Sequence, residues 1–164
     1  MIEARSVRYA IEEMTERQLL RTCGTATTAG TGLQGAIDLR FVDNTIVGCD
    51  TGLWLDDEGS STTALYANNI FTGATVAAVK RYGAGTATHG HNALFGNVTN
   101  YSGAAADGAG YVKTDCLLGT TGPVPALGQG SPCLGAADST VAAALDFFSV
   151  PRGPTPDIGA VERP

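Results

Sequence analysis

The sequence DNTIVG at residues 43–48 recurs in related form as NNIFTG at residues 68–73 and as HNALFG at residues 91–96. Each copy reads as a polar residue, an asparagine, a small or apolar residue, a large apolar residue, a variable residue and a glycine. The copies begin 25 and then 23 residues apart, at positions 43, 68 and 91. Self-similarity at a period of roughly 20–50 residues is typical of solenoids, propellers and arrays. The spacing therefore predicts a stack of similar coils.

The segments around the asparagines have the pattern of short strands rather than of helices. Apolar runs such as GLWL at 52–55 and VAAV at 76–79 are bounded by Gly, Asn and Asp, which favours strands and turns. Three short strands with their turns fill a coil of this length, so we predict an all-β fold, a short parallel β-helix of about four coils. A leucine-rich solenoid would need a regular leucine spacing, and a β-sandwich would not need a repeated asparagine.

The repeated asparagines suit the inside of such a stack. Asn tolerates left-handed backbone conformations, so it can turn the chain between two strands, and its amide both donates and accepts hydrogen bonds. Stacked coils would place Asn44, Asn69 and Asn92 about 4.8 Å apart, which predicts a hydrogen-bonded asparagine ladder. The alternative is three solvent-exposed turn residues. The glycine that closes each phrase is expected at a positive φ or at a close approach of the chain to itself.

Residues 1–22 have the pattern of an amphipathic helix. Val7, Ile11 and Met14 recur at helical spacing, and charged residues fill the positions around them. Because the open end of a coil must be covered, we predict an N-terminal α-helical cap. A free helix used for self-association is the alternative. The segment lacks the apolar run of a signal peptide, and no apolar stretch approaches the roughly 18 residues of a membrane span.

Four phrases near the C-terminus resemble the closing segment of a known family. They are GSPCLGAAD at 130–138, DFF at 146–148, PRGP at 151–154 and DIGAVE at 157–162. Together with the asparagine phrases, they resemble bacterial right-handed parallel β-helix proteins with the pectate-lyase-like fold, many of which are named choice-of-anchor proteins. The usual Arg-Pro of that family is replaced here by Arg152-Gly153-Pro154.

The resemblance implies a right-handed coil and an irregular C-terminal cap. On this basis the chain divides into a capping helix at residues 1–22, β-helix coils at 23–118 and a cap segment at 119–164. The cap is expected to fold over the last coil, with Asp157 and Glu162 holding turns. Members of the family are mostly extracellular or on the cell surface. This chain shows no export signal, so its localisation stays open.

Composition limits the partners and the use of cysteine. A formal net charge of −6 argues against nucleic acid or anionic lipid as the main partner. No CxxC spacing occurs, so we expect no zinc site. Cys116–Cys133 is the first disulfide to test, because the resembled family is mostly exported and both residues lie in the irregular terminal region. The alternative is that all the cysteines are buried thiols, and the full set is Cys23, Cys49, Cys116 and Cys133.

Acidic and basic residues follow two equivalent apolar runs. Asp56, Asp57 and Glu58 follow the first run, whereas Lys80 and Arg81 follow the second, with Arg81 placed 24 residues after Asp57. In pectate-lyase-like enzymes, clustered acids bind calcium and a basic residue abstracts a proton. An ordinary cross-strand ion pair explains the same pattern. We favour the structural interpretation and expect no catalytic residue, metal or cofactor.

Two histidines and one tryptophan are further candidates. His89 and His91 would share one side of a strand, but the sequence indicates no third metal ligand, and His91 occupies the turn position of its phrase. Trp54 should point outward if its neighbours Leu53 and Leu55 point inward. An exposed ring on a flat sheet can stack on a sugar. The candidate carbohydrate-binding residues are therefore Trp54, Tyr82 and Arg81, with packing under a loop or at a dimer contact as the alternative.

These observations favour a non-catalytic structural or binding module that recognises carbohydrate or a protein partner. One alternative is a polysaccharide-lyase-like enzyme that acts on uronate polymers. Another is a scaffold that assembles into a homo-oligomer through its N-terminal helix or its strand edges. The number of coils separates the first two functions, since catalytic β-helices generally have more coils and a longer groove.

Overall fold

Short strands make up all of the regular structure in the part of the chain that is described. The computed structural model describes residues 20–22, 32–34, 39–57, 63–83, 86–119 and 124–163. Within these ranges there is no helix, and the strands are β1 (Leu20–Thr22), β2 (Gly32–Gln34), β3 (Leu39–Val42), β4 (Thr45–Val47), β5 (Thr51–Asp57), β6 (Thr63–Ala67), β7 (Ile70–Thr72), β8 (Ala77–Gly83), β9 (Thr86–Gly90), β10 (Ala93–Phe95) and β11 (Tyr101–Gly103).

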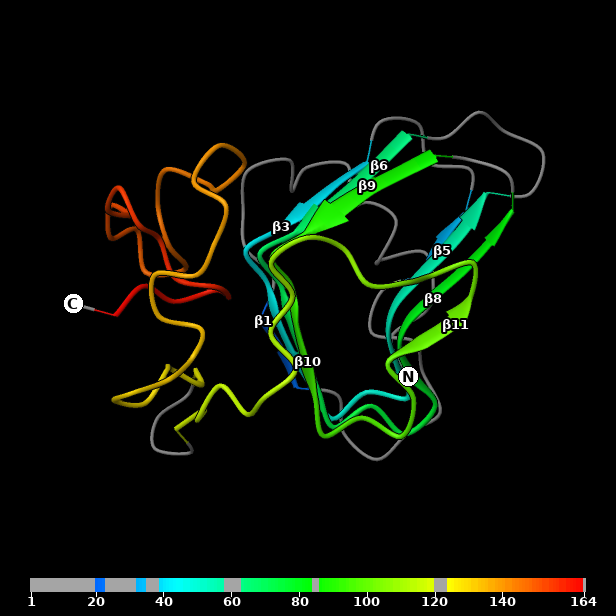
Figure 1. Cartoon of the computed structure of the whole chain (residues 1–164), viewed down its shortest axis with the longest axis horizontal. Helices are drawn as coiled ribbons and strands as arrows, with labels where there is room; N and C mark the ends of the chain where they lie inside the picture. Colours follow the sequence, from blue (N-terminus) through cyan, green and yellow to red (C-terminus); the bar gives the residue numbers. More distant parts are fainter. Residues whose placement is uncertain are drawn as a thin grey trace.

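The strands form three parallel sheets that the chain visits in turn. Sheet A has the order β1-β4-β7-β10, sheet B has β11-β8-β5-β2 and sheet C has β3-β6-β9. One passage through sheets C, A and B is called a coil below, and the described ranges contain such passages at residues 39–57, 63–83 and 86–103. Figure 1 shows the chain winding past the three sheets, with the strands of each sheet stacked together. The arrangement is consistent with a parallel β-helix.

A sharp corner separates sheet C from sheet A in every coil. The residue at this corner is Asp43, Asn68 or His91, and its φ is 56°, 57° or 51°. Asn, Asp and His enter this left-handed region more readily than other side chains do. The bend thus lies one residue before the repeated asparagine to which the sequence analysis assigned it. The glycines that close the three phrases also have positive φ, as expected: Gly48, Gly73 and Gly96.

Alternate residues of the strands point into the coils and form a first core. Ile46, Phe71 and Leu94 are register partners in sheet A. Leu53 and Val79 are register partners in sheet B. All five side chains are at most 1% exposed. Because full burial of one such side chain is worth about 1.5–3 kcal/mol, this interior stack contributes strongly to stability.

The C-terminal part of the chain lies against the outer face of sheet A. Ile70 and Ala93, which point away from the coil interior, pack with Cys116, Leu127 and Ile158 in a second core. Figure 1 shows the orange and red C-terminal segment beside β1, β3 and β10. The prediction that this segment folds over the last coil is therefore wrong, because it packs against a side of the stack. Sheet A is buried on both faces, as parallel sheets usually are.

Residues 131–163, called the clasp below, bind the corner residue of each coil. The side chain at each corner makes a hydrogen bond with the clasp backbone, and in the middle coil it makes two. The pairs are Asp43 with Ala143 at 2.6 Å, Asn68 with Asp138 at 2.8 and 3.1 Å, and His91 with Ala136 at 2.9 Å. The clasp thus ties successive coils together along one edge of the stack.

The predicted N-terminal helix falls mostly outside the described residues. Residues 1–19 are not described, whereas Leu20–Thr22, which the sequence analysis also assigned to the helix, form β1 and pair with β4. No helix in the described ranges has the length and apolar character needed to cross a membrane.

Candidate functional site

The repeated asparagines form a hydrogen-bonded ladder inside the coils. Asn44 donates from its backbone N–H and from Nδ2 to Oδ1 of Asn69, at 3.0 and 2.9 Å. Asn69 donates in the same way to Oδ1 of Asn92, at 2.9 and 3.0 Å. All three residues are at most 3% exposed. In a dry interior such connected hydrogen bonds support one another, provided that every member is present.

The ladder also satisfies the coil backbone and ends at a tyrosine. Nδ2 of Asn69 donates to the carbonyl oxygen of Phe41, and Nδ2 of Asn92 donates to that of Tyr66. Asn92 donates further to the hydroxyl of Tyr111 at 3.1 Å. The amides therefore bind groups of the chain itself, which makes the ladder a structural element rather than a ligand site.

The outer face of sheet B brings together an indole, an ammonium group and a phenol. Trp54 and Lys80 are register partners on β5 and β8, and Tyr82 lies two residues further along β8. Nζ of Lys80 lies 4.5 Å from the ring centroid of Trp54 and 5.2 Å from that of Tyr82. Both distances are within the roughly 6 Å reach of a cation–π interaction. We call Trp54, Lys80 and Tyr82 the aromatic–lysine patch.

The two rings of the patch differ in exposure. Leu53 and Leu55 are buried on the inner side of β5, so Trp54 lies on the outer side, as strand alternation predicts. Trp54 is nevertheless half-buried, and its Nε1 atom is buried without a hydrogen-bond partner among the described residues. Tyr82 is 41% exposed. The phenol is therefore the more accessible ring.

Arg81 does not share the face of the aromatic–lysine patch. Its register partner on β5 is Leu55, which is buried, and alternation along β8 puts it on the same side as buried Val79. The positive charge of Arg81 instead affects the pKa of His89 in the neighbouring sheet C. Burial lowers the pKa of His89, and the positive charge of Arg81 lowers it further. Arg81 is thus directed away from any ligand bound on the outer face of sheet B.

The predicted carbohydrate-binding set is therefore divided between two faces. Trp54 and Tyr82 lie together, Arg81 lies on the other side, and Lys80 takes the place that was assigned to Arg81. The sequence did carry a signal for Lys80. Residues two apart in a strand share a face, so alternation back from Tyr82 leads to Lys80.

The acidic and basic residues after the two apolar runs are not in the predicted register. Asp57 lies opposite Gly83, and Leu55 lies opposite Arg81. The sequence predicted that Asp57 and Arg81 are direct partners on neighbouring strands. The observed register shows that they are not. Partners in sheets A and B differ in spacing, because Thr45 pairs with Ile70, 25 residues on, whereas Asp57 pairs with Gly83, 26 residues on. The extra residue comes from the turn at 73–76, which is one residue longer than the turn at 48–50, and the prediction had used a spacing of 24. Glu58 lies outside the described residues.

The two histidines have different structural roles. The ring of His89 stacks on that of Tyr66, with centroids 4.8 Å apart, and its Nδ1 lies 3.0 Å from the hydroxyl of Tyr111. The lowered pKa of His89 keeps the imidazole neutral at pH 7, so Nδ1 can accept a hydrogen bond from Tyr111. His91 instead occupies a corner and donates to the clasp. In the described ranges, no three His, Cys, Asp or Glu side chains are grouped as a metal site requires.

Carboxylates and one arginine hold the clasp in shape. Arg152 forms an ion pair with Glu162 at 2.9 Å, and the Arg152 side chain is only 2% exposed. The same guanidinium donates to the carbonyl oxygens of Asp157 and Gly159. Asp146 accepts three backbone N–H groups of the same segment. Apart from Nε of Arg152, which is buried without a hydrogen-bond partner among the described residues, these groups bind one another and the backbone, so their role is structural.

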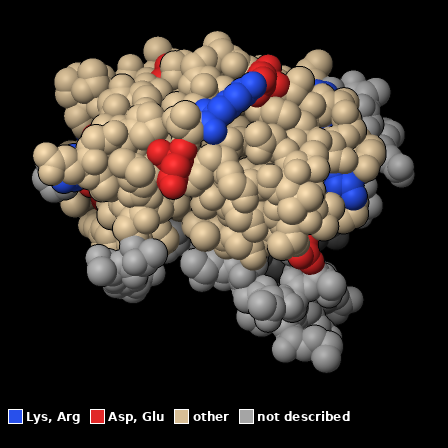
Figure 2. Space-filling view, turned by 60° about the horizontal axis from the view of Figure 1, so that its bottom comes forward, with Lys and Arg blue, Asp and Glu red and all other residues tan. Residues whose placement is uncertain are grey.

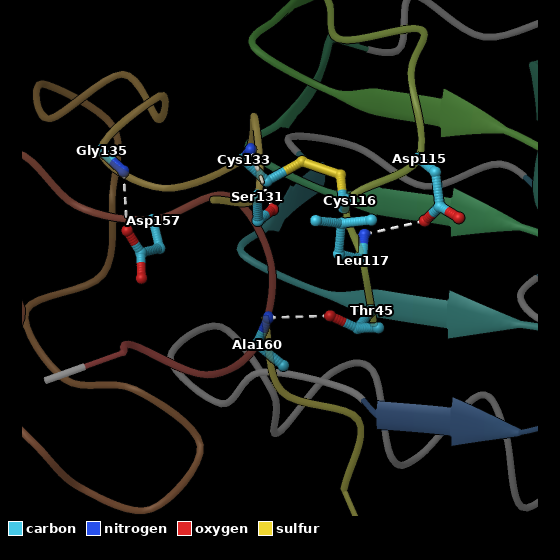
Figure 3. The surroundings of a disulfide bond; sticks show 9 residues. All are labelled: Thr45, Asp115, Cys116, Leu117, Ser131, Cys133, Gly135, Asp157 and Ala160. Atoms are coloured by element: carbon cyan, nitrogen blue, oxygen red, sulfur yellow. Dashed lines mark hydrogen bonds between the residues drawn. A yellow bond between two sulfur atoms is a disulfide. The ribbon is translucent and has the colours of Figure 1, made fainter. Parts of the chain in front are cut away.

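A disulfide crosses the second core. Cys116 and Cys133, the pairing that the sequence singled out first, are bonded, with Cα atoms 5.5 Å apart. Figure 3 shows this bond together with the N–H of Ala160, which donates to Oγ1 of Thr45 in β4 at 3.0 Å. The bond therefore links the segment that follows the coils to the beginning of the clasp. Cys49 is also disulfide-bonded.

Charged groups are sparse on the surface seen in Figure 2, where Lys, Arg, Asp and Glu side chains are few, scattered and mixed in sign. Such a face offers no extended field to a polyelectrolyte.

No family model matches the chain, and no curated protein matches it in sequence. Among the described residues, the aromatic–lysine patch is the group whose geometry suits binding of a ligand.

Proposed function

We propose that this chain is a non-catalytic binding module that recognises carbohydrate through the aromatic–lysine patch. The observation that carries the proposal is the ammonium group of Lys80 between the rings of Trp54 and Tyr82 on the outer face of sheet B. An aromatic ring offers an apolar face to the C–H groups of a sugar, and an ammonium group donates hydrogen bonds to sugar hydroxyls. A protein partner is the second candidate for this patch, because aromatic residues are enriched at interfaces.

In this proposal the scaffold is a short right-handed parallel β-helix of about four coils with an N-terminal α-helical cap. We assign it to the bacterial pectate-lyase-like β-helix proteins that its C-terminal phrases resemble. The three parallel sheets and the asparagine ladder support this assignment. The Cys116–Cys133 bond favours an oxidising location outside the cytoplasm, where disulfides persist.

The uronate lyase alternative has less support from the geometry. It would require the acids after the first apolar run to face the bases after the second. Asp57 instead lies opposite Gly83, and Lys80 is directed to two aromatic rings. A net charge of −6 also disfavours a polymer of uronates.

An array of neutral and acidic glycans, probed with the full chain, tests the proposed function. We expect binding to a neutral glycan that the double variant Trp54→Ala/Tyr82→Ala loses, provided that its circular dichroism matches the parent. Phe148→Ala is a matched control, because it removes a 55% exposed ring from the clasp, and it should bind like the parent. Failure of the parent to bind any glycan, or binding that survives in the double variant, would contradict the proposal.

A further inference from the structure

One face of the Trp54 indole, the larger ring of the aromatic–lysine patch, is covered by Lys80 and is not open to a ligand. Nζ of Lys80 lies 4.5 Å from the ring centroid of Trp54. Atoms of a stacked sugar would sit at about the same height, since carbon atoms in contact are about 3.5–4.0 Å apart. Lys80 and a sugar would therefore compete for that face of the indole. The rest of Trp54 is half-buried, with Nε1 fully covered.

We propose that the sugar stacks on Tyr82, that Lys80 selects the sugar through its hydrogen-bond donors, and that Trp54 is a positioning residue for Lys80. The class of ligand is a neutral glycan that contains pyranose rings. The inference rests on the proposed carbohydrate binding and refines it by giving each residue of the patch a separate role.

Tyr82 has the accessibility that a stacking platform needs. Its side chain is 41% exposed near the end of β8. Gly103 of the neighbouring strand lies beside it, and a Cβ added to Gly103 would come within 3.3 Å of Cδ1 of Tyr82. The glycine, which also has a φ of 71°, therefore leaves the flank of the ring uncovered.

Lys80 is available to donate hydrogen bonds to that sugar. Across the described residues no ion pair includes Lys80, and its ammonium group lies over two aromatic rings. A cation–π interaction uses the charge of the ammonium group but does not consume its three N–H donors. Its Nζ lies over the ring of Tyr82 as well, 5.2 Å from the centroid. The sugar therefore takes the face of Tyr82 that Lys80 leaves open, and the ammonium group reaches past the ring edge to a hydroxyl at the rim of that sugar.

Trp54 explains why a flexible side chain can serve as a selective donor. A lysine loses considerable rotamer entropy when it is fixed. The cation–π contact with Trp54 holds the ammonium group in place before the ligand arrives, so less ordering is needed on binding. Trp54 therefore acts on the ligand through Lys80.

Calorimetric titration of a neutral glycan, chosen from the array, tests these roles with three single variants. Tyr82→Ala and Lys80→Met should each weaken binding about tenfold or more, whereas Trp54→Leu should weaken it about threefold. The Phe148→Ala control should bind like the parent. If Trp54→Leu weakens binding as much as Tyr82→Ala does, or if Tyr82→Ala binds normally, the assignment of the platform is overturned while carbohydrate binding itself stands.

A second measurement tests the positioning role without any glycan. In the parent, the ring current of Trp54 should shift the NMR signals of the Lys80 Cε protons upfield. Trp54→Leu should return these signals towards those of an exposed lysine, with thermal melting used to confirm that the variant is folded. Unshifted Lys80 signals in the parent would overturn the positioning role. Failure of the parent to bind any glycan would instead reject the proposed function and the roles built on it.

Discussion

At the scale of single residues, each asparagine of the ladder satisfies polar groups from more than one coil. Asn69 accepts the backbone N–H and Nδ2 of Asn44, and it donates to Asn92 and to the carbonyl oxygen of Phe41. It is fully buried. A residue without hydrogen-bonding capacity at this position would leave several buried groups without partners, and one such group costs about 1–3 kcal/mol.

Replacement of the middle member of the ladder should therefore be costly. We expect Asn69→Leu to lower the free energy of unfolding by about 3 kcal/mol or more, since several groups lose partners together. Urea unfolding followed by circular dichroism measures the difference. Thr88→Leu is a control on the exposed side of β9 and should stay within about 0.5 kcal/mol of the parent. Equal unfolding midpoints for Asn69→Leu and the parent would show that the ladder adds nothing to stability.

At the scale of elements, the sequence predicted the pattern within a coil better than the relation between coils. The repeated phrase fixes where sheet C ends and sheet A begins, because an asparagine with one set of partners must occupy the same place in each coil. The register in sheet B depends on turn length, and the one extra residue in the turn at 73–76 places Lys80, rather than Val79, opposite Trp54. A count of apolar residues carries no information about that turn.

The sequence also did not indicate on which side of the stack of coils the clasp packs. Its phrases indicated a closing segment, but nothing in them specified an end of the stack or a flank. The signal lay in the coils, where Asp43, Asn68 and His91 are polar at the same corner. Asp43 and Asn68 are fully buried there. A turn residue that looks solvent-exposed in a sequence can instead be the partner of a distant backbone segment.

The contact between Asp43 and the clasp should make stability depend on pH in an unusual direction. Burial raises the pKa of Asp43 above its ordinary value of 3.8, and this outweighs the N–H of Ala143 and the charges of Arg152 and Arg40, which lower it. Between 3.8 and the raised pKa, the folded state binds more protons than the unfolded state. The contribution of Asp43 to the free energy of unfolding therefore falls as pH rises through that window.

Asp43→Asn removes this titration while keeping a side chain that suits the corner, since Asn68 occupies the same corner of the next coil. The stability of the variant relative to the parent should rise as pH increases from acid to neutral, measured by urea unfolding across that range. Asp107→Asn is a control of opposite sign. Hydrogen bonds from Lys113 and Tyr101 lower the pKa of Asp107, so this variant should lose relative stability as pH rises. If the difference in free energy of unfolding between Asp43→Asn and the parent does not change with pH, Asp43 does not have the raised pKa in the folded state.

At the scale of the whole molecule, two cores share one sheet. The coil interior fills the inner face of sheet A, and the second core covers its outer face with the C-terminal segment. The outer face of sheet B presents the aromatic–lysine patch instead. The strands of sheet A, at about 4.8 Å spacing, give a stack roughly 15–20 Å tall. A surface of this height accommodates a few sugar rings but not a long polymer chain.

These dimensions lead to a prediction about catalysis. We expect no turnover of pectate, alginate or chondroitin, with or without added calcium. The stack is short, Asp57 lies opposite Gly83, and Arg81 lies on the other side of β8 from Lys80. The net charge of −6 further disfavours a uronate polymer. Lyase products carry a new carbon–carbon double bond that absorbs ultraviolet light, so the absorbance of the mixture should stay flat. A steady rise that Lys80→Ala abolishes would make Lys80 a catalytic base, whereas a rise that persists in Lys80→Ala would point to a contaminating lyase.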